Sequence, residues 1–167
     1  MSKKLKNTQS IDAFSNEFEE KVLFVNRCAK VLKGGRKFSF SALILIGDRE
    51  GGNIGYGFAK ANELADAIKK GGDAARKNII SVKMDKTTIP HEVLVKWDGV
   101  QLLLKPAPEG TGIIAGSKVR AVLEMAGIKD VVAKSLGCNN PINLVHATFK
   151  ALQMMQCREE CLQRRGA

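Results

Sequence analysis

Bulky apolar side chains occupy almost every second position from Phe38 to Ile46, which is the period of a half-buried β-strand. A shorter apolar stretch at 21–25 predicts a strand before it. In the segment 54–59, bulky residues alternate with Gly, Gly and Ala, so the third predicted strand has one almost bare face that invites another backbone to approach closely. Apolar residues then recur at helical spacing, which predicts a helix over 63–80 packed across the sheet, with Asn62 as its N-cap.

Two features of this predicted helix bear on its regularity. Gly71 and Gly72 lie in its interior, where each glycine costs about 1 kcal/mol relative to alanine at an exposed position. Asp73 precedes Lys77 by four residues, which is the spacing of an intrahelical ion pair. We therefore interpret the cations of this helix as partners of its own acids.

The second half of the chain predicts further elements. Asp-Gly at 98–99 separates two apolar runs within 92–105, which is a strong signal for a β-hairpin. After a segment rich in Pro and Gly, apolar positions 119, 122, 123 and 126 predict an amphipathic helix that ends at Gly127. Segment 128–136 predicts a strand, and Asn140 followed by Pro141 predicts the capped start of a final helix, which the tail extends before fraying. The predicted order is β-β-β-α followed by β-β-α-β-α.

The pattern divides the chain into four parts and predicts an α+β protein. Residues 1–20 are expected to be an arm that orders only against a partner. Residues 21–82 form the first predicted domain, residues 83–156 form the second, and 157–167 is a C-terminal tail. No apolar run approaches the roughly 18 residues that cross a bilayer, and residues 1–14 lack the apolar stretch of a secretory signal. We therefore expect a cytoplasmic protein with no membrane partner.

The distribution of charge adds a binding function to this fold. The chain carries 27 Lys and Arg against 17 Asp and Glu, a formal net charge of +10. Six of the cations, and no acid, lie within 21–37, around the pair Gly34-Gly35. Glycines let a backbone turn with positive φ and approach a phosphate, so this run favours a nucleic-acid contact over a merely solvated basic loop. A purely structural hairpin turn is the alternative for the two glycines.

No catalytic constellation emerges from the sequence. The run GTGIIAG at 110–116 has the spacing GxGxxxG, which differs from a dinucleotide fingerprint, and it does not directly follow a predicted strand. Its backbone N–H groups adjoin a predicted helix start and can hold a phosphate, although a plain glycine turn explains them equally well. His91 and His146 belong to no metal or catalytic motif, and the four cysteines form no CxxC pair, which suits reduced thiols. We expect no enzyme activity, no cofactor and no metal.

Two long blocks of the chain resemble one known family. Residues 34–64, GGRKFSFSALILIGDREGGNIGYGFAKANEL, and residues 109–148, EGTGIIAGSKVRAVLEMAGIKDVVAKSLGCNNPINLVHAT, are similar to the family of bacterial small-subunit ribosomal protein five. The likeness covers about residues 20–155. It implies a first domain similar to the double-stranded-RNA-binding fold, β-β-β-α. It also implies a second domain similar to the ribosomal-protein-five domain two-like fold, β-β-α-β-α, with a left-handed βαβ crossover.

The resemblance also implies a function. Members of this family bind the small-subunit (16S) rRNA where the head of the particle meets its body, contact small-subunit proteins four and eight, and support decoding accuracy. The matching positions here are a loop from Arg27 to Arg36 that reaches RNA near the spectinomycin site, a group leading into the first helix, and the small or polar residues of the second block. The predicted RNA-binding residues are Arg27, Lys30, Lys33, Gly34, Gly35, Arg36, Lys37, Lys60, Asn62, Thr111, Gly112, Gly116, Ser117, Lys118, Arg120, Asn139 and Asn140.

Two other classes of protein stay open at this point. A free-standing RNA-binding module that regulates messenger or double-stranded RNA outside the ribosome would carry the same basic surface. A nucleotide-dependent enzyme is a more distant alternative. The chain departs from the family pattern at Gly71-Gly72, at Cys138, where Ser is commoner, and in the tail after Met155.

Overall fold

The computed structural model describes residues 18–166, except for the side chains of residues 158–160, and contains two four-stranded sheets. The first sheet has the order β1-β2-β3-β4 and is antiparallel throughout. One helix connects its last two strands along the chain. These elements are β1 (Glu19–Leu32), β2 (Gly35–Asp48), β3 (Asn53–Ala61), α1 (Leu64–Lys77) and β4 (Ile79–Ser81). Residues 1–17 of the predicted arm, which was expected over 1–20, lie outside the described residues. Residues 19 and 20 belong to β1.

The second sheet has the order β5-β6-β8-β7, and its strand β7 runs parallel to β8, with α2 connecting the two. Its elements are β5 (Val93–Trp97), β6 (Val100–Pro106), β7 (Ile113–Ile114), α2 (Ser117–Met125), β8 (Val131–Gly137), α3 (Pro141–Met154) and α4 (Arg158–Arg165). The α+β class and both predicted orders are confirmed, with the short strands β4 and β7 in addition. No helix among the described residues is long and apolar enough to cross a membrane.

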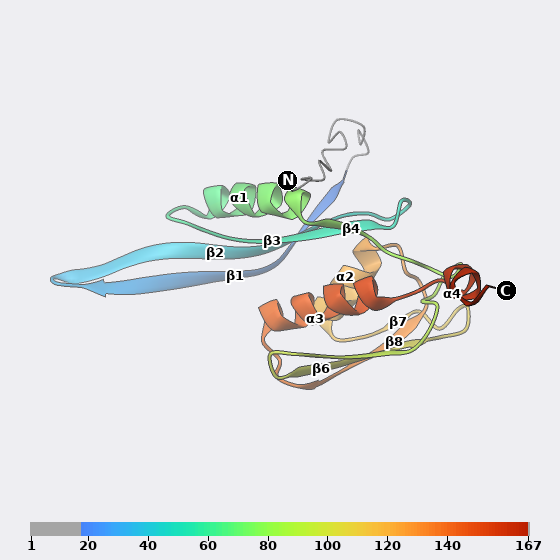
Figure 1. The fold of residues 1–167 in the computed structure, drawn as a ribbon. Coiled ribbons are helices and arrows are strands. Elements are labelled where there is room, and N and C mark those ends of the chain that lie inside the picture. Colours follow the sequence, from blue (N-terminus) through green and yellow to red (C-terminus); the bar gives the residue numbers. More distant parts are fainter. Residues whose placement is uncertain (1–17, 167) are drawn as a thin grey trace, which may run out of the picture.

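The elements stack in four layers, with the first sheet between two layers of helices (Figure 1). Helix α1 covers one face of this sheet, and Ala42 and Ile44 of β2 are buried there with Ala67. On the opposite face, Leu43 and Leu45 are buried in a larger core shared with α2, α3 and the second sheet. The prediction that this part of β2 is half-buried is therefore wrong, because the second domain covers the face that would otherwise meet water.

The bare face of β3 allows α1 to pack at very short range. A methyl group added at Gly57 would overlap the carbonyl oxygen of Gly71, and one added at Gly71 would lie 2.7 Å from the Ile44 side chain. Gly71 and Gly72 are both buried within one continuous helix. The glycine pair is thus compatible with a regular helix, and at Gly71 a side chain would have no room against the sheet.

The ends of α1 differ from the prediction. Its N-cap is Glu63 rather than Asn62, and the Glu63 side chain makes no capping hydrogen bond. The helix ends at Lys77, because Ile79 pairs with Gly55 as part of β4, the fourth strand of the sheet. Within the helix Asp73 lies 3.7 Å from Arg76, at a spacing of three residues, in place of the predicted pair with Lys77.

In the second half, the turn and cap signals were mostly correct. Asp98 and Gly99 both have positive φ, 42° and 78°, as a two-residue hairpin turn between twisted strands requires. The Asn140 side chain accepts a hydrogen bond from the backbone N–H of Ile142 at 3.3 Å and so caps α3. The prediction for the tail is wrong, since α3 ends at Met154 and residues 158–165 form a separate helix, α4.

The close packing of α1 on β3 gives a direct prediction. Replacing Gly57 with Ala places the new methyl group against backbone atoms of α1. Backbone atoms cannot avoid the overlap by a change of rotamer, so the whole helix must move away from the sheet. We expect the free energy of unfolding to fall by about 1–3 kcal/mol, as for other overpacked core positions. Urea unfolding of the two proteins measures this difference.

Gly35→Ala is the matched control, because a methyl group at Gly35 has no atom within 4 Å and its φ is not in the left-handed region. We expect this variant to unfold within about 0.5 kcal/mol of the parent, as exposed substitutions usually do. Equal losses for the two variants would contradict the packing explanation.

Candidate nucleic-acid interface

A long ribbon formed by β1 and β2 extends beyond both α1 and the second domain (Figure 1). Its strands pair in antiparallel register up to Leu32 opposite Gly35, which leaves only Lys33 and Gly34 in the turn. Gly34 takes a φ of 94°, a conformation that residues with a side chain rarely adopt. Every residue from 29 to 38 is exposed. The tip of the ribbon is therefore accessible from all sides.

The basic run at 21–37 is part of this ribbon and is not a loop. The sequence predicted a strand over 21–25 followed by a loop, whereas the structure continues β1 to Leu32. Near the tip both faces of the two strands meet solvent, so the residues need not alternate between apolar and polar. Backbone hydrogen bonds between the two strands maintain the ribbon there, and this interaction is invisible in the hydrophobic pattern.

The ion pairs that the structure describes on the ribbon involve the residues far from its tip. Ion pairs lie at its base: Lys21 with Glu124, and Glu20 with Arg76, each with a nitrogen-to-oxygen distance of 2.9 Å. Among the residues that the structure describes, no carboxylate pairs with the five cations nearer the tip, which are Arg27, Lys30, Lys33, Arg36 and Lys37. A projecting element with an uncompensated positive charge attracts polyanions such as nucleic acids.

Two further predicted residues lie beside the base of the ribbon. Lys60 is near the end of β3, directly opposite Ser41 of β2. Asn62 lies in the short connection between β3 and α1. Nine of the predicted residues thus belong to the ribbon or lie beside it in the first domain: Arg27, Lys30, Lys33, Gly34, Gly35, Arg36, Lys37, Lys60 and Asn62.

The glycine loop before α2 already holds an anion of the protein itself. The backbone N–H of Gly112 donates to the carboxylate of Asp130 at 2.9 Å, and Thr111 donates its hydroxyl hydrogen to the carbonyl oxygen of Pro108 at 2.8 Å. The hydrogen bond from Gly112 lowers the pKa of the buried Asp130 below its ordinary value. The Gly112 amide therefore binds an internal carboxylate, in the position where the sequence suggested a phosphate.

The other predicted residues of the second domain fall into two separate groups. Gly116, Ser117, Lys118 and Arg120 lie at the start of α2, and the last three line a shallow hollow of about 310 Å³ against Lys21 and its neighbours in β1. Asn139 and Asn140 lie at the start of α3, where Asn139 accepts a hydrogen bond from Ser135 at 3.5 Å. The group at α2 therefore adjoins the start of β1, and neither group belongs to the tip of the ribbon.

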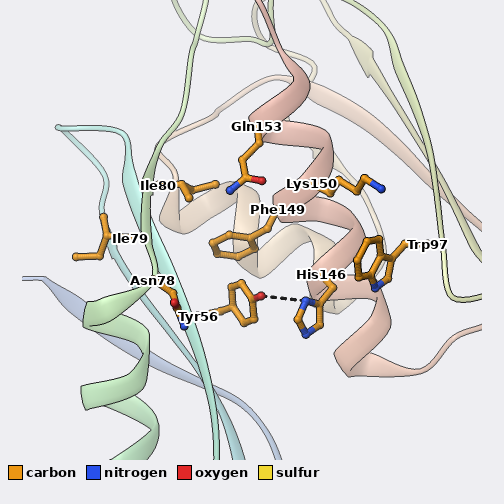
Figure 2. Close-up of a pocket in the computed structure, with 9 residues that line it drawn as sticks. All are labelled: Tyr56, Asn78, Ile79, Ile80, Trp97, His146, Phe149, Lys150 and Gln153. Atoms are coloured by element: carbon orange, nitrogen blue, oxygen red, sulfur yellow. Dashed lines mark hydrogen bonds between the residues drawn. The ribbon is translucent and has the colours of Figure 1, made fainter. Parts of the chain in front are cut away.

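A groove of about 420 Å³ runs between the two domains beside α3 (Figure 2). Among its lining residues, the Tyr56 hydroxyl and Nδ1 of His146 form a hydrogen bond of 2.9 Å, and the His146 ring stacks on Trp97 with 6.1 Å between ring centres. Burial raises the pKa of Tyr56. His146 thus connects α3 to the first sheet.

Three of the remaining candidates for chemistry, His91, Cys157 and Cys161, line one pocket, whereas His146 lines another. Nε2 of His91 accepts a hydrogen bond from the backbone N–H of Gln156 at 3.2 Å, far along the chain from His146. All four cysteines are free thiols. Within the described part of the chain no three His, Cys, Asp or Glu residues are grouped so as to hold a metal ion.

An α+β scaffold that presents a projecting ribbon of unpaired cations is characteristic of nucleic-acid-binding proteins. Comparison with known families gives two matches: the model described as ribosomal protein S5, N-terminal domain, matches residues 18–83, and the one described as ribosomal protein S5, C-terminal domain, matches residues 95–165. The chain belongs to the ribosomal protein S5 family. It is a structural ribosomal protein and not an enzyme.

Curated relatives agree with this family. A protein of Protochlamydia amoebophila is 70% identical over 151 residues, which are 90% of each chain. One of Chlamydia trachomatis serovar D is 66% identical over 152 residues, which are 90% of this chain and 92% of the relative. Both relatives carry the name small ribosomal subunit protein uS5. The match of the second family model also reaches residue 165, so it includes α4, which the sequence comparison above had left outside the family pattern.

The sequence did not reveal the roles of two residues at these surfaces. Asp130 anchors the glycine loop, yet its position within a predicted strand gave no sign of this role. The period of the strand predicts that Phe38 lies on its buried face, whereas Phe38 is 43% exposed on the ribbon. In the sequence, only the short separation between Phe38 and the predicted turn at Gly34-Gly35 could have indicated that Phe38 is exposed.

The Asp130 contact predicts a pH dependence of stability. Because the folded pKa lies below the unfolded value of about 3.9, the ionised carboxylate stabilises the fold above that pH. This contribution is lost as the pH falls through the folded pKa. We expect the free energy of unfolding of the parent to fall more steeply below about pH 4 than that of Asp130→Asn, which carries no charge there. Urea unfolding at a series of pH values measures both slopes, and parallel curves would contradict the assignment.

Proposed function

We propose that the chain is a structural constituent of the small ribosomal subunit and that it binds the 16S rRNA of that subunit through the β1–β2 ribbon. The observation that carries this proposal is the exposed ribbon tip, whose five cations have no acidic partner among the described residues. The names of the curated relatives support the assignment to the small subunit. A cytoplasmic location, on the ribosome, follows from this role.

The arrangement of the two domains suggests how the protein acts on RNA. The ribbon extends from a sheet that shares its core with the second domain, so the ribbon and the basic start of α2 hold fixed positions relative to each other. RNA segments bound at these two places would be held in a fixed relation. We propose that this rigidity stabilises the head of the subunit relative to its body and supports accurate decoding.

The proposed contacts are mainly to phosphates and to RNA shape. Double-stranded RNA hides its major groove, and cations on an extended ribbon reach phosphates more readily than base edges. The seventeen predicted residues keep this role, except that the Gly112 amide is already occupied by Asp130. Small-subunit proteins four and eight as neighbours, and a position near the spectinomycin site, are part of the same proposal through family membership.

Sedimentation tests the assignment to the ribosome. In a sucrose gradient of a cell lysate, we expect the protein to migrate with the small-subunit RNA and to remain there after a high-salt wash. Recovery only in the light, soluble fractions would favour the alternative, a free RNA-binding module that acts outside the ribosome.

The charge of the ribbon tip gives a second test. Replacing Lys33 and Arg36 with Ala removes two cations that release counterions from RNA, so binding to a 16S rRNA transcript should weaken. The slope of log affinity against log salt should become shallower by about 1–2. Lys69→Ala with Lys70→Ala is the control, because both side chains are exposed on α1 and the change in net charge is the same. If the ribbon variant keeps the slope of the parent, the ribbon does not bind phosphate.

A further inference from the structure

The two faces of the ribbon carry different chemistry near its tip. In the antiparallel register Val31 lies directly opposite Arg36, and Lys30 lies directly opposite Lys37. Residues opposite each other share a face of a two-stranded sheet, and successive residues alternate between faces. Phe38 is two residues from Arg36 and therefore lies on the Arg36 face, whereas the two lysines lie on the other. The register alone thus separates arginine and aromatic side chains from lysine side chains.

One face combines planar and apolar groups that are open to solvent. The guanidinium carbon of Arg27 lies 3.8 Å from the centre of the Phe38 ring, so these two side chains are stacked on the same face. Phe38 is 43% exposed and Val31 is 74% exposed on the ribbon. We define the arginine–aromatic face by Arg27, Val31, Arg36 and Phe38.

The opposite face places two positive charges side by side. Lys30 and Lys37 face each other across the strands, an arrangement of like charges that destabilises a sheet. No carboxylate among the described residues pairs with either lysine. An anion bound between the two ammonium groups would relieve their repulsion. We define the lysine face by these two residues.

We propose, building on the function proposed above, that the two faces bind different parts of one RNA. The lysine face contacts backbone phosphates, because an ammonium group acts as a compact point charge. The arginine–aromatic face stacks on unpaired nucleotide bases, which pack on aromatic rings and on guanidinium planes. Near the tip the ribbon is only two strands wide, so an RNA that closes around it meets both faces. The cations on both faces favour RNA over a protein as the occupant of the apolar patch.

Two kinds of substitution separate these roles. Binding of the full chain to a 16S rRNA transcript is measured at a series of salt concentrations. For Lys30→Ala with Lys37→Ala we expect the salt slope to become shallower by about 1.4–1.8, because two phosphate contacts are lost. For Arg27→Lys and for Phe38→Leu, which both keep the net charge, we expect an unchanged slope. Affinity should fall at every salt concentration, by about 5- to 150-fold for Phe38→Leu, the range for loss of one stacked base.

Controls keep each outcome interpretable. The pair Lys69→Ala with Lys70→Ala on α1 should leave the slope closer to that of the parent, and thermal unfolding by circular dichroism should show that all variants remain folded. If Arg27→Lys and Phe38→Leu bind as the parent does, base stacking is refuted, and a protein partner becomes the better explanation for the apolar patch. If the variant Lys30→Ala with Lys37→Ala has the same salt slope as a parent that binds the transcript, the division into two faces is refuted. A parent that does not bind the transcript refutes the proposed function itself.

Discussion

Burial of β2 on both of its faces is the constraint on which the rest of this structure depends. Ile44 packs against α1, and its neighbour Leu45 packs into the core of the second domain. A single strand therefore belongs to two cores at once, and neither domain can tilt without disturbing both. Because the same strand continues outward into the ribbon, its direction is fixed by the packing of the whole molecule.

The ribbon presents positive charge to solvent, and its own contacts contribute little to the stability of its tip. Its tip has exposed apolar side chains and opposing lysines, and its cations form no ion pair with any residue that the structure describes. Such a segment gains little from its own contacts and relies on the buried part of the sheet to keep its register. This arrangement is expected of a surface that is completed by a charged partner.

Two hydrogen bonds between distant residues position the second domain: one holds its glycine loop, and the other joins it to the first sheet. Asp130 receives the Gly112 amide hydrogen and so fixes the glycine loop that leads to β7 and α2. The hydrogen bond between Tyr56 and His146 satisfies two polar groups at the partly buried boundary between the domains. Both contacts link residues distant in sequence, and both hold backbone segments that predicted RNA-binding residues occupy or adjoin.

The sequence by itself determined the types and order of the main elements, the hairpin turn at Asp98-Gly99, the cap at Asn140 and the concentration of cations at 21–37. These features depend on local periodicity, on backbone preferences of single residues or on composition, which a chain carries without its fold. Tertiary structure decided the burial of β2, the extension of β1 through the basic run, the ends of α1, and the separation of the predicted site into several places. Each of these depends on which strand or helix lies alongside, because hydrogen bonds and packing between distant segments leave no period in the sequence.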